Sequence, residues 1–232
     1  MIRWSPSGPY EVVFSTREGG VSEGPYASLN LGRMTGDDVA RVDENRSILC
    51  AEIGVDVEKL ALNRQIHSPT VHRADAGSRG RPADGLWTDE PGLPILAMAA
   101  DCLPIALVRA DGETPAVAVL HAGWRGILGR ILEDGVQALG KRVRAAIGPG
   151  IGPCCYKVGP DVAQRFTTTY GSAVLDGRTL DLWGAAERSL REAGVEEVHR
   201  VDLCTHCNPD RFFSHRRTGK PRGVQGVIAR VA

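Results

Sequence analysis

The chain has 232 residues, of which 28 are basic, 28 are acidic and 42% are hydrophobic. This length and apolar fraction exclude a disordered chain and are sufficient for a sizeable core. A formal net charge of zero argues against a nucleic-acid-binding protein whose affinity comes from neutralising phosphates. The longest apolar stretch, residues 95–100, is far too short to span a bilayer. We therefore expect neither a nucleic-acid nor a membrane partner.

The N-terminus and the cysteines bear on the compartment. Residues 1–6 contain no apolar segment of the kind found in secretory signals. Six cysteines are too few for a disulfide scaffold in a chain of this length. We expect a cytoplasmic protein with reduced thiols, in which Cys50 belongs to the core side of a helix.

Apolar periodicity and turn residues predict the first half of the chain as short elements. We expect a strand at 11–16, a helix at 37–53, a strand at 60–66 and a loop at 74–92. Three apolar runs that are bounded by turn residues predict buried strands at 94–100, 104–109 and 115–121.

The second half of the chain alternates between helical and strand patterns. We expect helices at 124–139, 160–170 and 181–193, with Gly140 capping the first, and strands at 143–147, 198–203 and 224–231. No change of composition marks a linker, so the prediction is a single α+β domain over residues 1–232.

Three side chains that bind metals well stand at the ends of predicted strands, namely His67, Cys102 and His121. Two imidazoles and a thiolate form a catalytic zinc set, because three protein ligands leave the fourth position open. Zinc in such a site acidifies a bound water, and copper binds the same donors. The alternative is structural: a buried core thiol and two hydrogen-bonded histidines.

Other segments carry weaker signals. The Gly/Pro-rich run 147–153 lacks the GK[ST] of a phosphate-binding P-loop, so it is either a loop that approaches a ligand or a plain connection. Cys204 and Cys207 form one CxxC, which is half of a structural zinc site. The adjacent Cys154 and Cys155 do not make a second CxxC, so the sequence favours neither a four-cysteine zinc site nor a redox pair.

Basic residues near these segments suggest anion binding. Arg125 lies at a predicted helix start, where backbone N–H groups attract anions. Arg216 and Arg217 either clamp an anion or form a solvated basic turn, while the preceding Phe212 and Phe213 belong to the core.

Together the segments resemble the YfiH-type, laccase-domain family. The resemblance rests on FSTREGGVS at 14–22, SLNLG at 28–32, NR at 45–46, QIH at 65–67, ADGL at 83–86, ADCLP at 100–104, HAGWRG at 121–126, IGP at 147–149, CCY at 154–156, FFS at 212–214 and RR at 216–217. That family has been described as purine nucleoside phosphorylase, polyphenol oxidase and peptidoglycan editing factor.

The resemblance implies an α+β fold with mixed sheets packed against helices, and a catalytic zinc bound by His67, Cys102 and His121. It implies phosphorolysis of adenosine, inosine, guanosine and S-methyl-5'-thioadenosine, with adenosine deamination as a further activity. The partners would be purine nucleosides and phosphate, and the protein a monomer or a small homo-oligomer.

Roles for other residues follow as expectations. Asp84 or Asp101 would transfer protons in deamination. Arg125 is the first candidate for binding phosphate. The remaining candidates for binding substrate or phosphate are Arg46, Arg64, Arg216 and Cys155.

Three positions depart from the family pattern, and they bear on substrate preference. Ser68 replaces a glycine, Lys157 replaces a glutamate, and His215 replaces a tyrosine.

Three other functions remain open from the sequence. Six histidines are too few for the clusters of a multicopper oxidase, which disfavours a copper-binding polyphenol oxidase. An amidase acting on a cell-wall UDP-muramyl-amino-acid precursor would use either a zinc-bound water or Cys102 as nucleophile, and a metal-bound Cys102 excludes the second version. A non-catalytic metal-binding module is the third.

Overall fold

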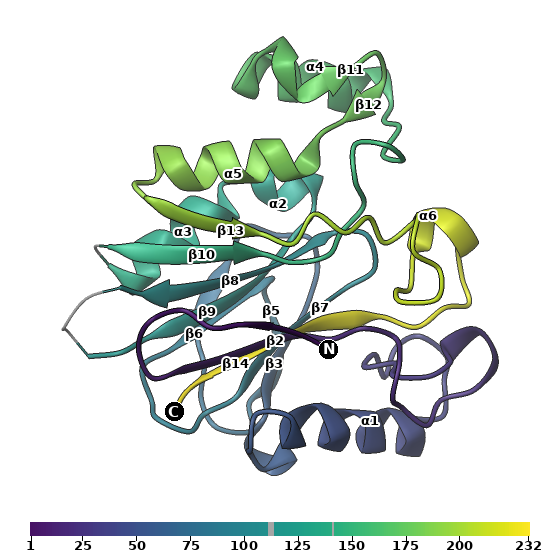
Figure 1. The fold of residues 1–232 in the computed structure, drawn as a ribbon, viewed down its shortest axis with the longest axis vertical. Helices are drawn as coiled ribbons and strands as arrows, with labels where there is room; N and C mark the ends of the chain where they lie inside the picture. The colour runs from purple at the N-terminus through teal and green to yellow at the C-terminus, as the bar shows by residue number, and fades with distance from the viewer. Residues whose placement is uncertain (111–113, 141) are drawn as a thin grey trace.

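Two six-stranded mixed sheets form the centre of the protein in a computed structural model that describes residues 1–110, 114–140 and 142–232 (Figure 1). In spatial order, sheet A contains β1 (Ile2–Trp4), β2 (Tyr10–Phe14), β14 (Gln225–Val231), β7 (Ile95–Ala99), β3 (Ala61–Arg64) and β5 (Arg79–Pro82). Sheet B contains β13 (Glu197–Arg200), β10 (Val143–Ile147), β8 (Leu103–Arg109), β9 (Val117–Ala122), β6 (Gly85–Thr88) and β4 (Val71–Arg73).

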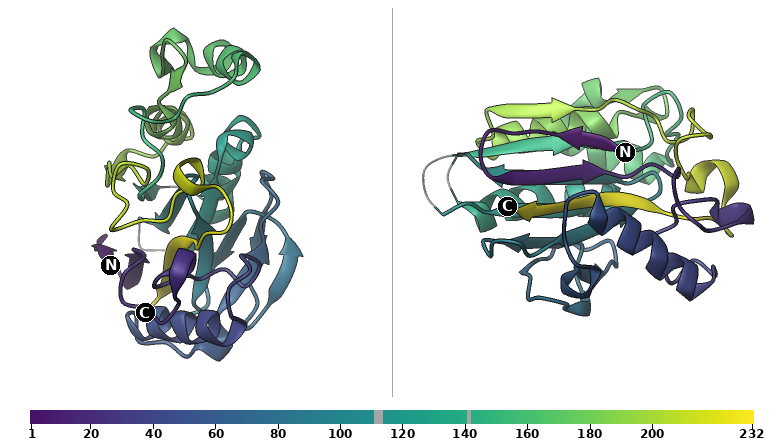
Figure 2. Two further views of the ribbon diagram at one scale, coloured as in Figure 1. Left: turned by 90° about the vertical axis from the view of Figure 1, so that its right-hand side faces the viewer. Right: turned by 60° about the horizontal axis from the view of Figure 1, so that its bottom comes forward.

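Helices cover the outer faces of both sheets. Sheet A packs against α1 (Val39–Ala51), and sheet B packs against α2 (Trp124–Leu128), α3 (Ile131–Leu139) and α5 (Leu182–Glu192). Beyond α5 lie α4 (Pro160–Tyr170) and the short pair β11 (Leu175–Asp176) and β12 (Thr179–Leu180), as Figure 2 shows. A further α-helix, α6 (His215–Thr218), is short and precedes β14, and 3-10 helices lie at Gly24–Tyr26, Val57–Lys59 and Ser172–Val174. This arrangement confirms the predicted α+β fold with mixed sheets packed against helices.

The central strands are buried on both faces, which explains their continuous apolar runs. In β9, Val117 and Val119 face the core between the two sheets, whereas Ala118 and Leu120 face the helices. The same alternation in β2 sends Phe14 to the inter-sheet core and Val13 toward α1. Strands of this kind are recognisable in a sequence because neither face needs polar residues.

Most of the predicted elements are confirmed. The strand expected at 143–147 and the helix expected at 160–170 have those bounds. Gly140 follows α3 with a left-handed φ of 87°, the conformation expected of a glycine cap. Cys50, Phe212 and Phe213 are buried, as predicted.

Two predictions are wrong. Residues 74–92 contain β5 and β6 rather than a continuous loop, because every residue of β5 is exposed and its sequence therefore shows no apolar alternation. The helix expected at 124–139 is two helices, because Arg130 adopts a left-handed φ of 75° between them. Several short elements were not predicted at all, namely β1, β4, β11, β12 and α6.

Three connections carry the chain from sheet A to sheet B, and they position the site described below. They link β3 to β4, β5 to β6, and β7 to β8. Because β3 pairs in parallel with both β5 and β7, the three connections leave the same edge of sheet A. Within the described residues, no helix is long and apolar enough to cross a membrane.

Candidate metal centre

The three predicted metal ligands come together where the chain crosses between the sheets. His67 follows β3, Cys102 joins β7 to β8, and His121 lies near the end of β9. Their possible ligand atoms all lie within 4.8 Å of one another. The rings of His67 and His121 meet edge to face, with centroids 4.9 Å apart. Tertiary structure thus makes one donor set from residues that lie 35 and 19 positions apart in the sequence.

Asp84, in the connection between β5 and β6, holds two of these ligands in place. Its Oδ1 lies 2.8 Å from Nδ1 of His121 and accepts a hydrogen bond of 3.0 Å from the backbone N–H of His67. Its Oδ2 accepts bonds from the backbone N–H groups of Ile66 and Ser68, and from the Ser68 hydroxyl. The Asp84 side chain is fully buried. A carboxylate that engages Nδ1 leaves Nε2 of His121 as the metal-binding nitrogen.

The electrostatics of the cluster favour an ionised thiol. Burial raises the pKa of the Cys102 thiol, but the His121 charge and hydrogen bonds from both imidazoles outweigh burial and lower it to about 6. Burial lowers the pKa of His121, but Cys102 and Asp84 outweigh burial and raise it. A thiolate is the form of cysteine that binds metals.

Close packing of backbone against the site explains the glycine in HAGWRG. A Cβ on Gly123 would lie 2.8 Å from Sγ of Cys102 and 3.4 Å from Cδ2 of His67. His67 and Asp101 both adopt left-handed φ angles, of 62° and 88°. Non-glycine residues hold such angles where the surrounding structure requires them, often at functional sites.

A cavity of about 800 Å³ opens beside the trio, and all three ligands line it. Its wall is strongly basic, because Asp101 is its one carboxylate among the described residues. The cationic side chains in the wall are Arg33, Arg46, Arg64, Arg79, Arg125, Arg216, Lys220 and Arg222. Such a surface attracts an anionic ligand.

Three of the arginines predicted to bind phosphate also make contacts within the protein. Arg46 is buried and donates from Nε and an Nη to the Leu31 carbonyl. Arg216 donates to the Lys157 carbonyl at 2.7 Å. Arg125 stacks on Trp124, with its guanidinium carbon 4.3 Å from the ring centroid. The helix after Gly123 has only five residues, which weakens the predicted contribution of a helix N-terminus at Arg125.

Arg64 and Lys220 are better placed to bind an anion. Both line the cavity, and neither has a side-chain hydrogen bond or ion pair with any part of the chain that the structure describes. Lys220 was not predicted, because nothing in its sequence context marks it.

The cavity also contains groups that sequence reasoning missed. Tyr156, Trp124 and Met98 supply apolar and aromatic surface. Gln65 pairs with the backbone of Met98, donating to its carbonyl at 2.6 Å and accepting from its N–H at 2.9 Å. This pairing joins the ends of β3 and β7 next to Cys102. Gln65 belongs to the QIH motif, in which a role was predicted for the histidine alone.

Two predicted residues lie outside the cavity wall. Asp84 contacts two of the possible metal ligands but does not line the cavity, so its geometry is that of a positioning residue. Cys155 does not line the cavity either. It lies in a second group of possible metal ligands, with Cys154, Cys204 and Cys207.

The donor set of the trio suits a borderline metal. One thiolate and two imidazoles are typical zinc ligands, and the buried carboxylate on Nδ1 of His121 is the partner that such ligands usually have. Copper binds the same donors. Of the six histidines, His67 and His121 alone belong to a group of metal ligands among the described residues. They are too few for the several coppers of a multicopper oxidase.

The chain belongs to the family described as multi-copper polyphenol oxidoreductase laccase, whose model matches residues 11–231. A curated purine nucleoside phosphorylase of Haemophilus influenzae is 33% identical, over 97% of this chain and 96% of the relative. One of Deinococcus radiodurans is 39% identical, over 94% and 89%. The Escherichia coli relative, purine nucleoside phosphorylase YfiH, is 35% identical over 88% and 86%.

Solved structures show the same fold. A Neisseria meningitidis protein superposes with a TM-score of 0.89 at 33% identity, covering 99% of this chain and 98% of the other. YlmD from Geobacillus stearothermophilus gives a TM-score of 0.86 at 31% identity, over 96% and 92%. The resemblance inferred from the motifs is therefore confirmed.

Proposed function

We propose that this protein is a zinc-dependent purine nucleoside phosphorylase whose single catalytic unit spans residues 1–232. The observation that carries the proposal is the placement of His67, Cys102 and His121 in the wall of a basic cavity of about 800 Å³. The volume lies in the range typical of small-molecule sites. Relatives named purine nucleoside phosphorylase, similar over nearly the whole chain, support the same activity.

The cavity supplies what phosphorolysis needs. A phosphate oxygen forms a bond to C1' of the ribose, the bond from C1' to the purine nitrogen breaks, and the purine leaves with the bonding electrons and takes up a proton. Arg64, Arg125 and Lys220 would hold the phosphate by charge-assisted hydrogen bonds. Trp124 and Tyr156 offer aromatic surface for the purine. Zinc bound to the trio would supply Lewis-acid polarisation of a substrate oxygen.

The substrates that we propose are adenosine, inosine, guanosine and S-methyl-5'-thioadenosine, and a product assay tests this. Inosine and phosphate should yield hypoxanthine and ribose 1-phosphate, with no cleavage when phosphate is omitted. Chromatography of the base and an enzymatic assay of the sugar phosphate measure both products. Absence of base release from all four nucleosides would contradict the proposal.

Adenosine deamination is a further activity of the same cavity in this proposal. Asp101 is the carboxylate that could transfer a proton there, because it lines the cavity and Asp84 does not. Asp101 accepts bonds from the Thr205 hydroxyl and from the backbone N–H of Arg216. Release of ammonia and inosine from adenosine without phosphate would support deamination, and adenine as the sole product in phosphate would contradict it.

One observation favours a second candidate, an amidase with Cys102 as nucleophile. Cys102, His121 and Asp84 form a thiol, an imidazole and a buried carboxylate in the order used by cysteine hydrolases. Zinc at the trio would block this chemistry, since a liganded thiolate cannot attack an amide carbonyl. The metal-free protein should then release an amino acid from a UDP-muramyl-amino-acid precursor, and zinc should inhibit it. The phosphorylase proposal predicts the opposite, namely that phosphorolysis requires zinc and that the metal-free protein is inactive.

A further inference from the structure

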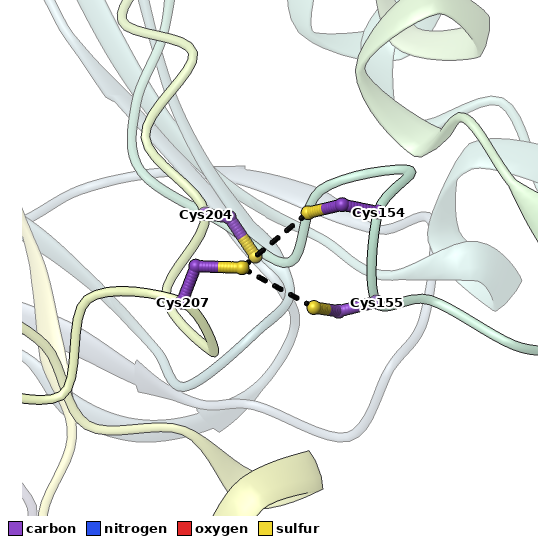
Figure 3. A group of neighbouring side chains, drawn as sticks. All are labelled: Cys154, Cys155, Cys204 and Cys207. Carbon is purple, nitrogen blue, oxygen red and sulfur yellow. Dashed lines mark hydrogen bonds between the residues drawn. The ribbon is translucent and has the colours of Figure 1, made fainter.

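A second group of possible metal ligands lies outside the cavity, in two loops that meet at one edge of sheet B. Cys154 and Cys155 belong to the loop after β10, and Cys204 and Cys207 belong to the loop after β13 (Figure 3). The four sulfur atoms all lie within 4.8 Å of one another. Sequence spacing did not favour this grouping, because one pair is adjacent and the other is a CxxC.

Parallel strand pairing explains why the loops meet. β10 pairs in parallel with β13, with Ile147 opposite Arg200, so the chain leaves both strands at the same edge of the sheet. The loops remain joined through a parallel bridge between Gly150 and Cys204, with the Thr205 N–H donating to the Gly150 carbonyl at 3.0 Å.

The sulfur distances match those around a tetrahedral ion. Zinc–sulfur bonds of roughly 2.3 Å place the sulfurs of a tetrahedron about 3.8 Å apart. Sγ of Cys207 lies 3.5 Å from Sγ of Cys154 and 3.3 Å from Sγ of Cys155. These separations are well beyond the roughly 2.05 Å of a disulfide bond, and all six cysteines are free thiols.

Core packing accounts for only part of the cluster, since Cys204 belongs to the hydrophobic core and Cys155 packs against it. Cys154 and Cys207 are exposed, and only Cys204 is buried. Thiols are weak hydrogen-bond donors, so hydrogen bonds between the sulfurs would contribute little to holding four cysteines together at the surface. A shared ion gives that reason.

The loop around Cys204 and Cys207 is already shaped by other groups. The Gly152 N–H donates to Sγ of Cys204 at 3.2 Å, and backbone donors of this kind support metal thiolates. Arg217 donates to the carbonyls of Thr205 and His206, the two residues between the cysteines. Asn208 donates to the Cys204 carbonyl at 2.8 Å.

We propose that Cys154, Cys155, Cys204 and Cys207 bind one zinc ion as a closed four-thiolate site, separate from the trio in the cavity. Four protein thiolates fill the tetrahedral positions, so the site is structural. Thiolate ligands select soft or borderline ions such as zinc over calcium and magnesium.

The proposed ion would fasten the loops that build one side of the cavity. Ile151 and Tyr156, on either side of the cysteine pair, line the cavity. From the other loop, Thr205 donates to Oδ1 of Asp101 at 2.7 Å. Loss of the ion should therefore loosen this wall while the trio keeps its own ligands.

Metal analysis of protein reconstituted with zinc under reducing conditions tests the proposal. We expect two zinc ions per wild-type chain. Cys102→Ala should retain one, and the double variant Cys204→Ser/Cys207→Ser should retain the other. Cys50→Ala, which removes a buried thiol outside both groups, is the matched control and should retain two.

Cobalt substitution distinguishes the two sites independently of activity. The thiolate-to-cobalt absorption of the wild type should fall by most of its intensity in Cys204→Ser/Cys207→Ser, and by a minor part in Cys102→Ala, since the sites contain four thiolates and one.

Two results would overturn the proposal, and neither needs a variant that folds. The first is a single zinc per wild-type chain, with Cys154 and Cys207 reacting freely with a thiol reagent in zinc-loaded protein. The second is a disulfide within the four cysteines that persists under the reducing conditions of reconstitution. Both measurements stand apart from phosphorylase activity, so failure of the proposed function would leave them unaffected.

Discussion

The two groups of possible metal ligands differ in number of donors, chemistry and surroundings. The trio of His67, Cys102 and His121 contributes three donors of mixed type and lines a basic cavity. The four cysteines contribute four donors of one type, from two loops beside a sheet edge. Three ligands leave a position for substrate, whereas four thiolates leave none.

The two groups also differ in the structure that surrounds them. The trio is held by the buried carboxylate of Asp84, by the left-handed backbone of His67 and by the close approach of Gly123. These contacts restrict the positions of its three side chains. The loop of the CxxC is instead shaped by hydrogen bonds that the Asn208 and Arg217 side chains donate to its backbone carbonyls. Donor number and supporting structure are therefore the reasons for which we propose a catalytic role for the first group and a structural role for the second.

The largest expected effect comes from Cys102→Ala. Turnover on nucleosides should fall by at least about 1000-fold, because metal-ion catalysis contributes several kcal/mol and each 1.36 kcal/mol is tenfold. Metal content should fall by one equivalent. Full zinc occupancy of the trio in this variant would contradict its assignment as a metal site. Cys50→Ala is the control and should retain both turnover and metal.

Asp84→Asn should have the next largest effect. The amide preserves the shape of the side chain but removes the negative charge beside Nδ1 of His121, so zinc affinity of the trio should fall by about 10- to 100-fold. Competition with a chelator of known affinity measures it. Asp89→Asn, which alters an exposed ion pair with Arg73, is the control. Equal affinities in the two variants would show that Asp84 does not position the ligands.

Gly123→Ala should damage the trio by crowding it. The added Cβ would lie 2.8 Å from Sγ of Cys102, and overpacking of this kind costs about 1–3 kcal/mol of unfolding free energy. Chemical denaturation and metal analysis measure the two consequences. Gly159→Ala is the matched control, because its Cβ would have no heavy atom within 4 Å. A similar loss of stability in both variants would argue against a specific contact with the thiol.

The smallest expected effect is on acid stability. Burial raises the pKa of Asp84, but bonds from His121 and Ser68 outweigh burial and lower it to about 2. Because the folded pKa is below the unfolded value, the stabilisation is present above about pH 4 and is lost as the pH falls toward 2.

The advantage of metal-free wild type over Asp84→Asn should therefore shrink by about 1–2 kcal/mol across this window. Unfolding in denaturant at a series of pH values measures the difference. A difference that stays constant down to pH 2 would show that Asp84 carries no depressed pKa.

The sequence predicted the parts of the site that depend on local pattern. The apolar runs around Cys102 and His121 indicated strands buried on both faces, and HAGWRG and ADCLP indicated the family. The structure brings the predicted trio together. The pattern did not reveal β5, since its exposed residues follow no apolar period, and it placed Cys155 on the substrate side rather than with three other cysteines.

Residue type and local burial were determined by the sequence itself, because side-chain chemistry and strand periodicity are local properties. Which donors share a site was decided only by tertiary structure. His67 and Cys102 meet because parallel pairing of β3 with β7 brings two crossovers to the same edge. Cys154 and Cys204 meet because β10 and β13 run parallel. Pairing between distant strands sets these distances, and neither the spacing nor the composition of the chain encodes them.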